Sequence, residues 1–205
     1  MYNKRSGLIL GFHGCNASLA RQTVLLNQTL KKSHNGYDWL GHGIYFWEHN
    51  LKRAWTFAAK KCKKNTSMAR PGVIGAVIDL GNCLDLLDKN CCQLLQSFHK
   101  LLLTIKQDLP QNSLIDKNNI FLKRELDCTV LELFHLWNES CGFPAFDSVR
   151  QAFEEGPVLY KDSAFREETH IQICIRNPKC IKAYFLPIKD YALTDTENEY
   201  AKEHF

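Results

Sequence analysis

The sequence predicts one α+β domain of 205 residues. Apolar runs typical of strands occur in the first and last thirds of the chain, whereas apolar residues recur at helical spacing in the middle third. Strands and helices do not alternate regularly, so a doubly wound parallel sheet is not expected. With 45% hydrophobic and 23% charged residues, the chain has the composition of a globular protein with a core of its own.

The N-terminal part is expected to contain a strand, a helix and a second strand. Residues 8–12 form a short apolar run that is typical of a buried strand. A helix should follow it, beginning at a polar cap, Asn16 or Ser18, and ending near residue 29. Residues 41–47 begin glycine-rich and end aromatic, which predicts a loop that leads into a strand.

An amphipathic helix and another strand come next. Within residues 50–63, the apolar side chains of Leu51, Ala54 and Ala58 share one helical face, and the lysines lie outside it. Residues 73–80 are rich in β-branched side chains, which predicts a strand.

The middle of the chain is expected to be a mainly helical insertion at about residues 83–145. Apolar residues recur at helical spacing over residues 84–102, and residues 126–137 form a second helix candidate. A polar connection containing proline and asparagine, residues 107–119, separates the two.

The C-terminal part returns to strands. Residues 149–153 are predicted to form a short helix, and residues 170–175 and 181–187 are predicted to be strands joined by a turn at 176–179. Residues 195–205 form a charged tail that is expected to be solvated.

Composition and cysteine usage exclude several classes of protein. The net charge of +4 permits an anionic cofactor but is too small for a dedicated nucleic-acid-binding protein. Nine cysteines, an odd number without paired zinc-ligand spacing, favour free thiols over disulfides or a metal site. Cys91 and Cys92 fall in a helical pattern, where one of them should face the core. Without a signal-like or membrane-spanning segment, the sequence predicts a cytoplasmic protein in a reducing compartment.

Three segments combine polar, aromatic and glycine residues next to apolar strands: residues 12–15, 41–47 and 167–175. In the third, period-2 alternation places Glu168, His170, Gln172 and Cys174 on one face, opposite a row of isoleucines at positions 171, 173 and 175. Each segment alone also has an ordinary structural explanation, because glycine-aromatic loops and polar strand faces are common in proteins without a site there. Their order and spacing together indicate function.

These segments resemble the ADP-ribosyltransferase superfamily, in the branch of the poly(ADP-ribose) polymerases and their mono-transferring relatives. Gly41-His42-Gly43-Ile44-Tyr45-Phe46 is similar to the Gly-Lys-Gly-Ile-Tyr-Phe motif of that branch, and His13-Gly14 resembles its upstream His-Gly pair. The resemblance implies a split antiparallel β-sheet core, which residues 83–145 would interrupt. It also implies a site built from a His, a Tyr and a Glu on three separate strands.

The resemblance implies NAD as the substrate and gives each matched residue a role. His13 would hydrogen-bond the nicotinamide ribose, Gly14 would offer its backbone to the carboxamide, and Tyr45 would pack against the nicotinamide ring beside Gly43. Thr56 stands where the family has a second stacking aromatic residue, so its neighbours are candidates for that role. They are Trp55, which we assign to NAD binding, and Phe57.

The third position of the triad departs from the family pattern. An ungapped match places His170 where the catalytic Glu should be, Gln172 lies two residues further along the same face, and Glu168 fits if the register shifts by two. The wider branch admits Gln, so Gln172 is preferred, with His170 and Glu168 as alternatives. A neutral Gln stabilises a cationic transition state less than a carboxylate does, which favours single transfer over chain elongation.

The sequence therefore predicts a mono-ADP-ribosyltransferase whose catalytic residues are His13, Tyr45 and Gln172. Its acceptor is a macromolecule, and a protein is favoured over a nucleic acid. The loop before the third motif carries candidates for acceptor contact, namely Tyr160, Phe165 and Arg166. The alternatives are an NAD glycohydrolase, an RNA-directed NAD-dependent transferase, and an inactive module that binds NAD or ADP-ribose. The RNA-directed alternative needs a basic set in the cleft, whereas a solvated helix face explains the lysines at positions 60, 61, 63 and 64 more simply.

Overall fold

The computed structural model describes residues 7–26, 28–64, 70–105 and 108–188. The charged tail at residues 195–205 lies outside these described residues. Across the described ranges, no helix is both long and apolar enough to cross a membrane.

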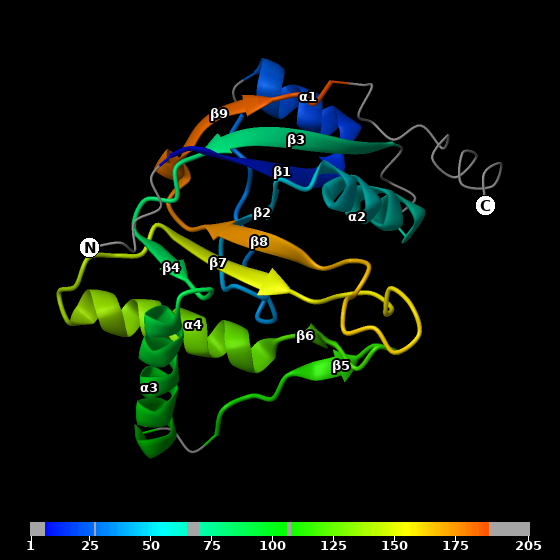
Figure 1. Ribbon diagram of the computed structural model, residues 1–205. Helices are drawn as coiled ribbons and strands as arrows, with labels where there is room; N and C mark the ends of the chain where they lie inside the picture. Colours follow the sequence, from blue (N-terminus) through cyan, green and yellow to red (C-terminus); the bar gives the residue numbers. More distant parts are fainter. Residues whose placement is uncertain (1–6, 27, 65–69, 106–107, 189–205) are drawn as a thin grey trace.

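The centre of the fold is a seven-stranded sheet with the order β4-β7-β8-β2-β1-β3-β9 (Figure 1). Its strands are β1 Ile9–Asn16, β2 Ile44–Glu48, β3 Pro71–Ile78, β4 Cys83–Asp85, β7 Ser148–Phe153, β8 His170–Ile175 and β9 Ile181–Phe185. All neighbouring strands are antiparallel except β4 and β7, which are parallel. The α+β class is confirmed, but the sheet is mixed rather than purely antiparallel, because β4 joins its edge.

Four helices pack on the sheet, and a two-stranded hairpin stands apart from it. They are α1 Ala17–Leu25, α2 Leu51–Lys64, α3 Lys89–Ile105 and α4 Glu125–Ser140, with the hairpin strands β5 Ser113–Ile115 and β6 Phe121–Lys123. Helices α1 and α2 contact β1 and β3, whereas α3 contacts α4 and β4 at the other end of the sheet. Figure 1 shows these two groups of helices at opposite ends. The segment 83–145 therefore supplies two helices, the hairpin and the edge strand β4.

Successive side chains of β2 point to alternate faces of the sheet and therefore pack in different core clusters. Ile44 and Phe46 are fully buried in a cluster that includes Ala20 of α1. Tyr45 packs on the other side, against the cluster formed with α3 and α4, and Trp47 packs against Ala54 of α2. Because Tyr45 and Trp47 point to the same face, that face is covered by α2 at one end and by α4 at the other.

Several predicted elements are confirmed with changed boundaries. The first strand continues through His13 and Gly14 to Asn16, whose side-chain oxygen caps α1 by accepting from the Ser18 N–H at 2.8 Å. Helix α1 ends at Leu25. The turn at 176–179 overlaps a short 3-10 helix, Pro178–Cys180. The polar connection at residues 107–119 contains strand β5, which pairs with β6 just beyond it in a hairpin that was not predicted.

The helix predicted at residues 149–153 is wrong. This segment is strand β7, which pairs with β4 on one side and β8 on the other. Short apolar runs do not separate helix from strand by periodicity alone. Here the alternation is further hidden because Arg150 is buried within the strand along with its apolar neighbour Val149.

All nine cysteines are free thiols. Cys91 packs against the cluster beneath α3, while Cys92 on the same helix is exposed, as the helical pattern predicted. In the described part of the chain, no group of three or more His, Cys, Asp or Glu side chains is placed to hold a metal ion.

A buried histidine should make the fold sensitive to acid. His135 of α4 packs against the rings of Phe134 and Phe146, and burial lowers its pKa to about 4 from the ordinary 6.5. The unfolded chain therefore binds a proton on this residue more readily, so its contribution to stability is present above pH 6.5 and is lost as the pH falls towards 4.

We expect His135→Leu to reduce the stability lost between pH 7 and pH 4.5 by about 2 kcal/mol. Urea unfolding of both proteins at both pH values measures this difference. Each protein is compared with itself at the two pH values. Any effect of the substitution on the free energy of unfolding at pH 7 therefore cancels. Equal losses in the two proteins would show that His135 is not the group that titrates.

Candidate active site

All the residues assigned to the site except Trp55 meet at one pocket of about 440 Å³. It lies where β1 and β2 separate: these strands pair only at Gly11–Glu48 and Phe12–Trp47, whereas β1 pairs with β3 along its whole length. Predicted site residues from three strands and the glycine loop line it: His13, Gly14, Gly43, Tyr45 and Gln172.

His13 stands at the point where β1 and β2 separate. Its Nδ1 lies 2.8 Å from the backbone carbonyl oxygen of Tyr45, so Nδ1 carries the hydrogen and donates it. Burial lowers the pKa of His13 and outweighs the opposing effect of this hydrogen bond, which leaves the ring neutral. Nε2 is therefore an acceptor.

Tyr45 holds the glycine loop in place. Its hydroxyl donates to the carbonyl oxygen of Gly41 at 2.6 Å and accepts from the N–H of Leu40 at 2.8 Å. Burial raises the pKa of Tyr45, so the phenol remains neutral. Gly43 must lack a side chain here, because a Cβ would stand 2.4 Å from Cys174 Sγ and 2.7 Å from the carbonyl oxygen of Ile175.

Glu132 of α4 fixes the same loop from the opposite side, and the sequence analysis missed it. One carboxylate oxygen accepts from the backbone N–H of His42 at 2.7 Å and from Arg176 at 2.6 Å. Burial opposes ionisation, but these hydrogen bonds and the Arg176 charge lower the pKa of Glu132, so it stays a carboxylate. The contact spans 90 residues of sequence, so no local pattern indicates it.

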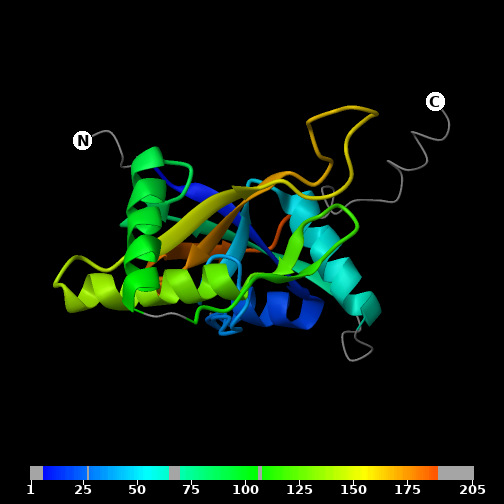
Figure 2. The ribbon, with the colours of Figure 1, turned by 90° about the horizontal axis from the view of Figure 1, so that it is seen from below.

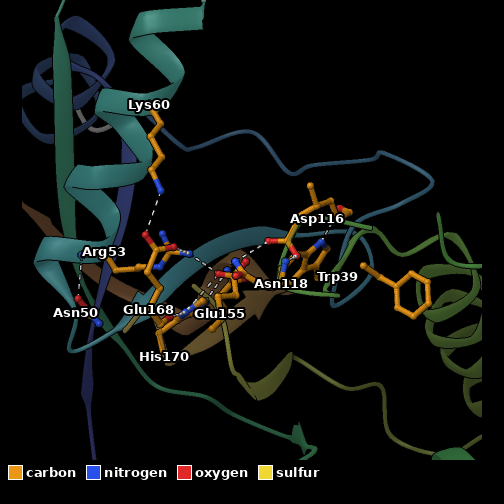
Figure 3. A network of polar contacts seen from close by, with 12 residues as sticks. Trp39, Asn50, Arg53, Lys60, Asp116, Asn118, Glu155, Glu168 and His170 are labelled. Carbon is orange, nitrogen blue, oxygen red and sulfur yellow. Dashed lines mark hydrogen bonds and ion pairs between the residues drawn. The ribbon is translucent and has the colours of Figure 1, made fainter. Parts of the chain in front are cut away.

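The three candidates for the third triad position lie in different surroundings. Gln172 lines the pocket beside Trp47, its partner across β2 and β8. The His170 side chain is fully buried, 3.1 Å from the Gln172 amide. Glu168 forms ion pairs at 3.1 Å with both Arg53 and Lys60 (Figure 3). Of the three, Gln172 is the one whose side chain is available to a ligand in the pocket.

Helix α2 presents a different aromatic residue to the pocket from the one assigned to NAD binding. Trp55 packs against the cluster between α2 and the sheet, whereas Phe57 lines the pocket, with its ring 5.0 Å from that of Trp47. Arg53 and Lys61 also line the pocket. These residues and Phe57 are spaced four apart and share one helical face. Their spacing could therefore have identified Phe57, rather than Trp55, as the aromatic residue on the same face as the two cations.

Gly14 is required by helix packing as well as by the pocket. A Cβ at this position would stand 2.2 Å from the backbone carbonyl oxygen of Ala54. Helix α2 therefore lies directly against β1 at Gly14. The same close approach brings Arg53 and Phe57 to the pocket.

Charged and polar residues that the motifs did not indicate complete the lining. Lys31, Asn35 and Asp38 come from the segment before the glycine loop, and Glu155 comes from the loop after β7. Glu155 forms an ion pair with Arg53. These residues lie in irregular segments, where spacing gives no indication of which side chains converge.

The β5–β6 hairpin borders the pocket beside the loop that joins β7 to β8. Both ribbon views place these two segments next to each other (Figures 1 and 2), and Leu122 of the hairpin and Glu155 of the loop line the pocket. The Leu122 carbonyl oxygen accepts from Trp39 Nε1 at 3.0 Å. In the loop, Tyr160 and Phe165 are exposed, while Arg166 donates to the Gly156 carbonyl oxygen at 2.9 Å.

A second pocket of about 420 Å³ lies against α3 and α4. It is mainly apolar and shares Trp39 with the first pocket. Gln151 of β7, which pairs with Gln172 across the sheet, lines this second pocket. The first pocket is the better candidate for chemistry, because His13, Tyr45 and Gln172 converge there from three separate strands together with the cations Lys31 and Lys61.

Comparison with known protein families finds none that matches this chain, and no curated protein sequence matches it either.

Proposed function

We propose that the protein binds NAD in the pocket between β1 and β2, breaks the nicotinamide–ribose bond and transfers ADP-ribose to a macromolecular acceptor. The observation that carries this proposal is the meeting of His13, Tyr45 and Gln172, from three strands, in one pocket. The separation of β1 from β2 agrees with the split sheet of the ADP-ribosyltransferase superfamily. The motif resemblance rests on residue identities alone. The pairing of β1 and β2 is a separate observation that supports the same fold.

We place the nicotinamide end of NAD against Tyr45, Phe57 and Gly14, which all line the pocket. Two aromatic rings suit a flat heteroaromatic ring, and Gly14 allows close approach to the backbone. His13 presents a neutral acceptor to a ribose hydroxyl. Together these groups hold both sides of the bond that breaks, and such positioning can account for a large part of a rate enhancement.

The diphosphate of NAD is assigned to Lys31 and Lys61. Both line the pocket, one from the segment before the glycine loop and one from α2. Arg53 is a poorer candidate, because Glu155 and Glu168 already pair with it. Asn35 and Asp38 lie in the same segment as Lys31 and bond to each other: Asp38 accepts from the Asn35 backbone N–H at 3.0 Å and from its side-chain amide at 3.2 Å, so they hold the shape of this segment.

Departure of nicotinamide leaves positive charge on the ribose. Gln172 meets this charge with an amide oxygen, which stabilises it less than a carboxylate would. Glu155 brings a carboxylate to the pocket, but Arg53 neutralises it. A modest electrostatic contribution favours a single transfer per target over chain elongation.

Gln172→Ala is expected to slow nicotinamide release at least tenfold, which corresponds to about 1.4 kcal/mol of barrier. Gln151→Ala is the matched control, because Gln151 is the cross-strand partner of Gln172 and lines the other pocket. Steady-state kinetics of both variants test the assignment. Full activity of the Gln172 variant would exclude it as the third catalytic residue.

Labelled NAD, incubated with the protein and a cell extract, tests the transfer itself. Label on a protein supports the proposal. Label on RNA or DNA would show that the acceptor is a nucleic acid instead of a protein. Release of free ADP-ribose with no labelled macromolecule in any extract would favour the NAD glycohydrolase. Binding without turnover is the second candidate function, and the observation that favours it is a neutral Gln at the third position.

A further inference from the structure

His170 lies next to Gln172 on the same face of β8 and has no role in the proposed reaction so far described. Its side chain is fully buried, between the rings of Trp47 at 6.3 Å and Phe153 at 6.0 Å. Figure 3 shows His170 next to Glu155 and Glu168, with Arg53 close by. A buried imidazole in contact with a catalytic amide can decide which end of that amide faces the substrate.

The hydrogen bonds of His170 determine its tautomer. Nδ1 lies 2.7 Å from the backbone carbonyl oxygen of Glu168, which can only accept, so Nδ1 carries the hydrogen. Burial lowers the pKa of His170 and outweighs the opposing effects of this bond and of Glu155, so the ring is neutral near pH 7. In a neutral ring with hydrogen on Nδ1, Nε2 is an acceptor.

The tautomer in turn determines the orientation of Gln172. The amide nitrogen of Gln172 lies 3.1 Å from His170 Nε2. Because that Nε2 can only accept, the NH2 group of Gln172 must be the side that faces it. The amide oxygen is then the group left to face a ligand. An amide turned the other way would place two N–H donors there instead.

We propose that His170 is a positioning residue that holds Gln172 with its amide oxygen towards the NAD ribose, and that protonation of His170 reverses the amide. This proposal rests on the proposed function of the pocket. In the protonated ring both nitrogens donate, so the Gln172 oxygen turns to His170 and the NH2 group faces the ribose. Donors facing a developing cation oppose the reaction.

The charged groups around His170 determine how easily it takes up a proton. Glu155 has a carboxylate oxygen 3.6 Å from Nδ1, and Glu168 lies two residues away on the chain; both favour the protonated ring. Arg53 of α2, which pairs with both carboxylates, opposes it. Protonation is therefore expected at a pH below the ordinary range for histidine.

Nitrogen-15 NMR of the ligand-free protein tests the arrangement without any need for turnover. At pH 7.5 we expect the His170 ring to carry its hydrogen on Nδ1, and the Gln172 side-chain amide to shift when His170 titrates at acidic pH. A hydrogen on Nε2 at pH 7.5, or a Gln172 amide that is unaffected by the titration, would overturn the proposal. Because NAD is absent, this result is independent of the proposed function.

Kinetics in a double-mutant cycle test the consequence for the reaction. His170→Phe should lower kcat for nicotinamide release about tenfold, leave KM for NAD little changed and remove the acidic decline of kcat. In a Gln172→Ala background, His170→Phe should have no further effect, because the amide that it positions is gone. Additive losses, or an acidic decline that persists in His170→Phe, would show that His170 acts only on the fold. If this variant does not fold, the NMR measurement on the unchanged protein decides.

Discussion

Replacing Tyr45 with alanine is expected to lower nicotinamide release from NAD at least a hundredfold. The ring forms part of the proposed nicotinamide site, and its hydroxyl holds Leu40 and Gly41 in the glycine loop. Alanine removes both the packing surface and the loop contacts. A displacement of about 1 Å in a reacting group is enough to cost about 100-fold in rate.

Tyr45→Phe is the matched control, because it keeps the ring and removes only the two hydrogen bonds. We expect an intermediate loss, which would separate packing from loop positioning. Circular dichroism and thermal unfolding establish that both variants are folded. Unchanged nicotinamide release by a folded Tyr45→Ala protein would mean that NAD does not react in this pocket.

Arg150→Met is expected to lower the free energy of unfolding by about 3–5 kcal/mol, the usual result of removing one partner from a buried ion pair. Arg150 is 1% exposed. Its guanidinium contacts both oxygens of Glu48 at 2.5 and 3.0 Å and both oxygens of Asp85 at 3.2 and 3.3 Å. These carboxylates belong to β2 and β4, which flank the β7–β8 pair, so the side chain connects strands that are not neighbours in the sheet. Methionine fills similar space but removes the guanidinium that bridges the two carboxylates.

Arg150→Lys is the control for charge, because it keeps a cation but cannot form two parallel hydrogen bonds with Glu48. Its free energy of unfolding should lie between those of the natural protein and of the methionine variant. Urea unfolding at pH 7 measures all three. A loss below about 1 kcal/mol for Arg150→Met would show that the pair behaves as an exposed one.

The sequence predicted regular elements well where a residue pattern is long and continuous. Helix α2 and strand β3 lie close to their predicted ranges, because an amphipathic stripe and a β-branched run are strong local signals. Strand β7 was missed because six residues are too few to establish a period and because Arg150 interrupts the buried pattern. Its identity depends on pairing with β8, which is set by tertiary contacts.

The candidate site was predictable where it coincides with motifs. His13, Tyr45 and Gln172 line one pocket although they are far apart in the sequence. Glu132 and Glu155 were not predictable, because each reaches the site from an element whose position is set by the whole fold. Helical spacing places Phe57 on the same face of α2 as Arg53 and Lys61 and separates it from Trp55, but the packing of the helix against Gly14 sets which face reaches the pocket.

Nicotinamide release from NAD by the purified protein tests the central claim most directly. We expect release above the rate of NAD alone, with Tyr45→Ala at least 100-fold slower and Gln151→Ala unchanged. NAD binding without release would mean that Gln172 does not support the chemistry and that the protein is a binding module. Neither binding nor release would contradict the assignment of the pocket to NAD.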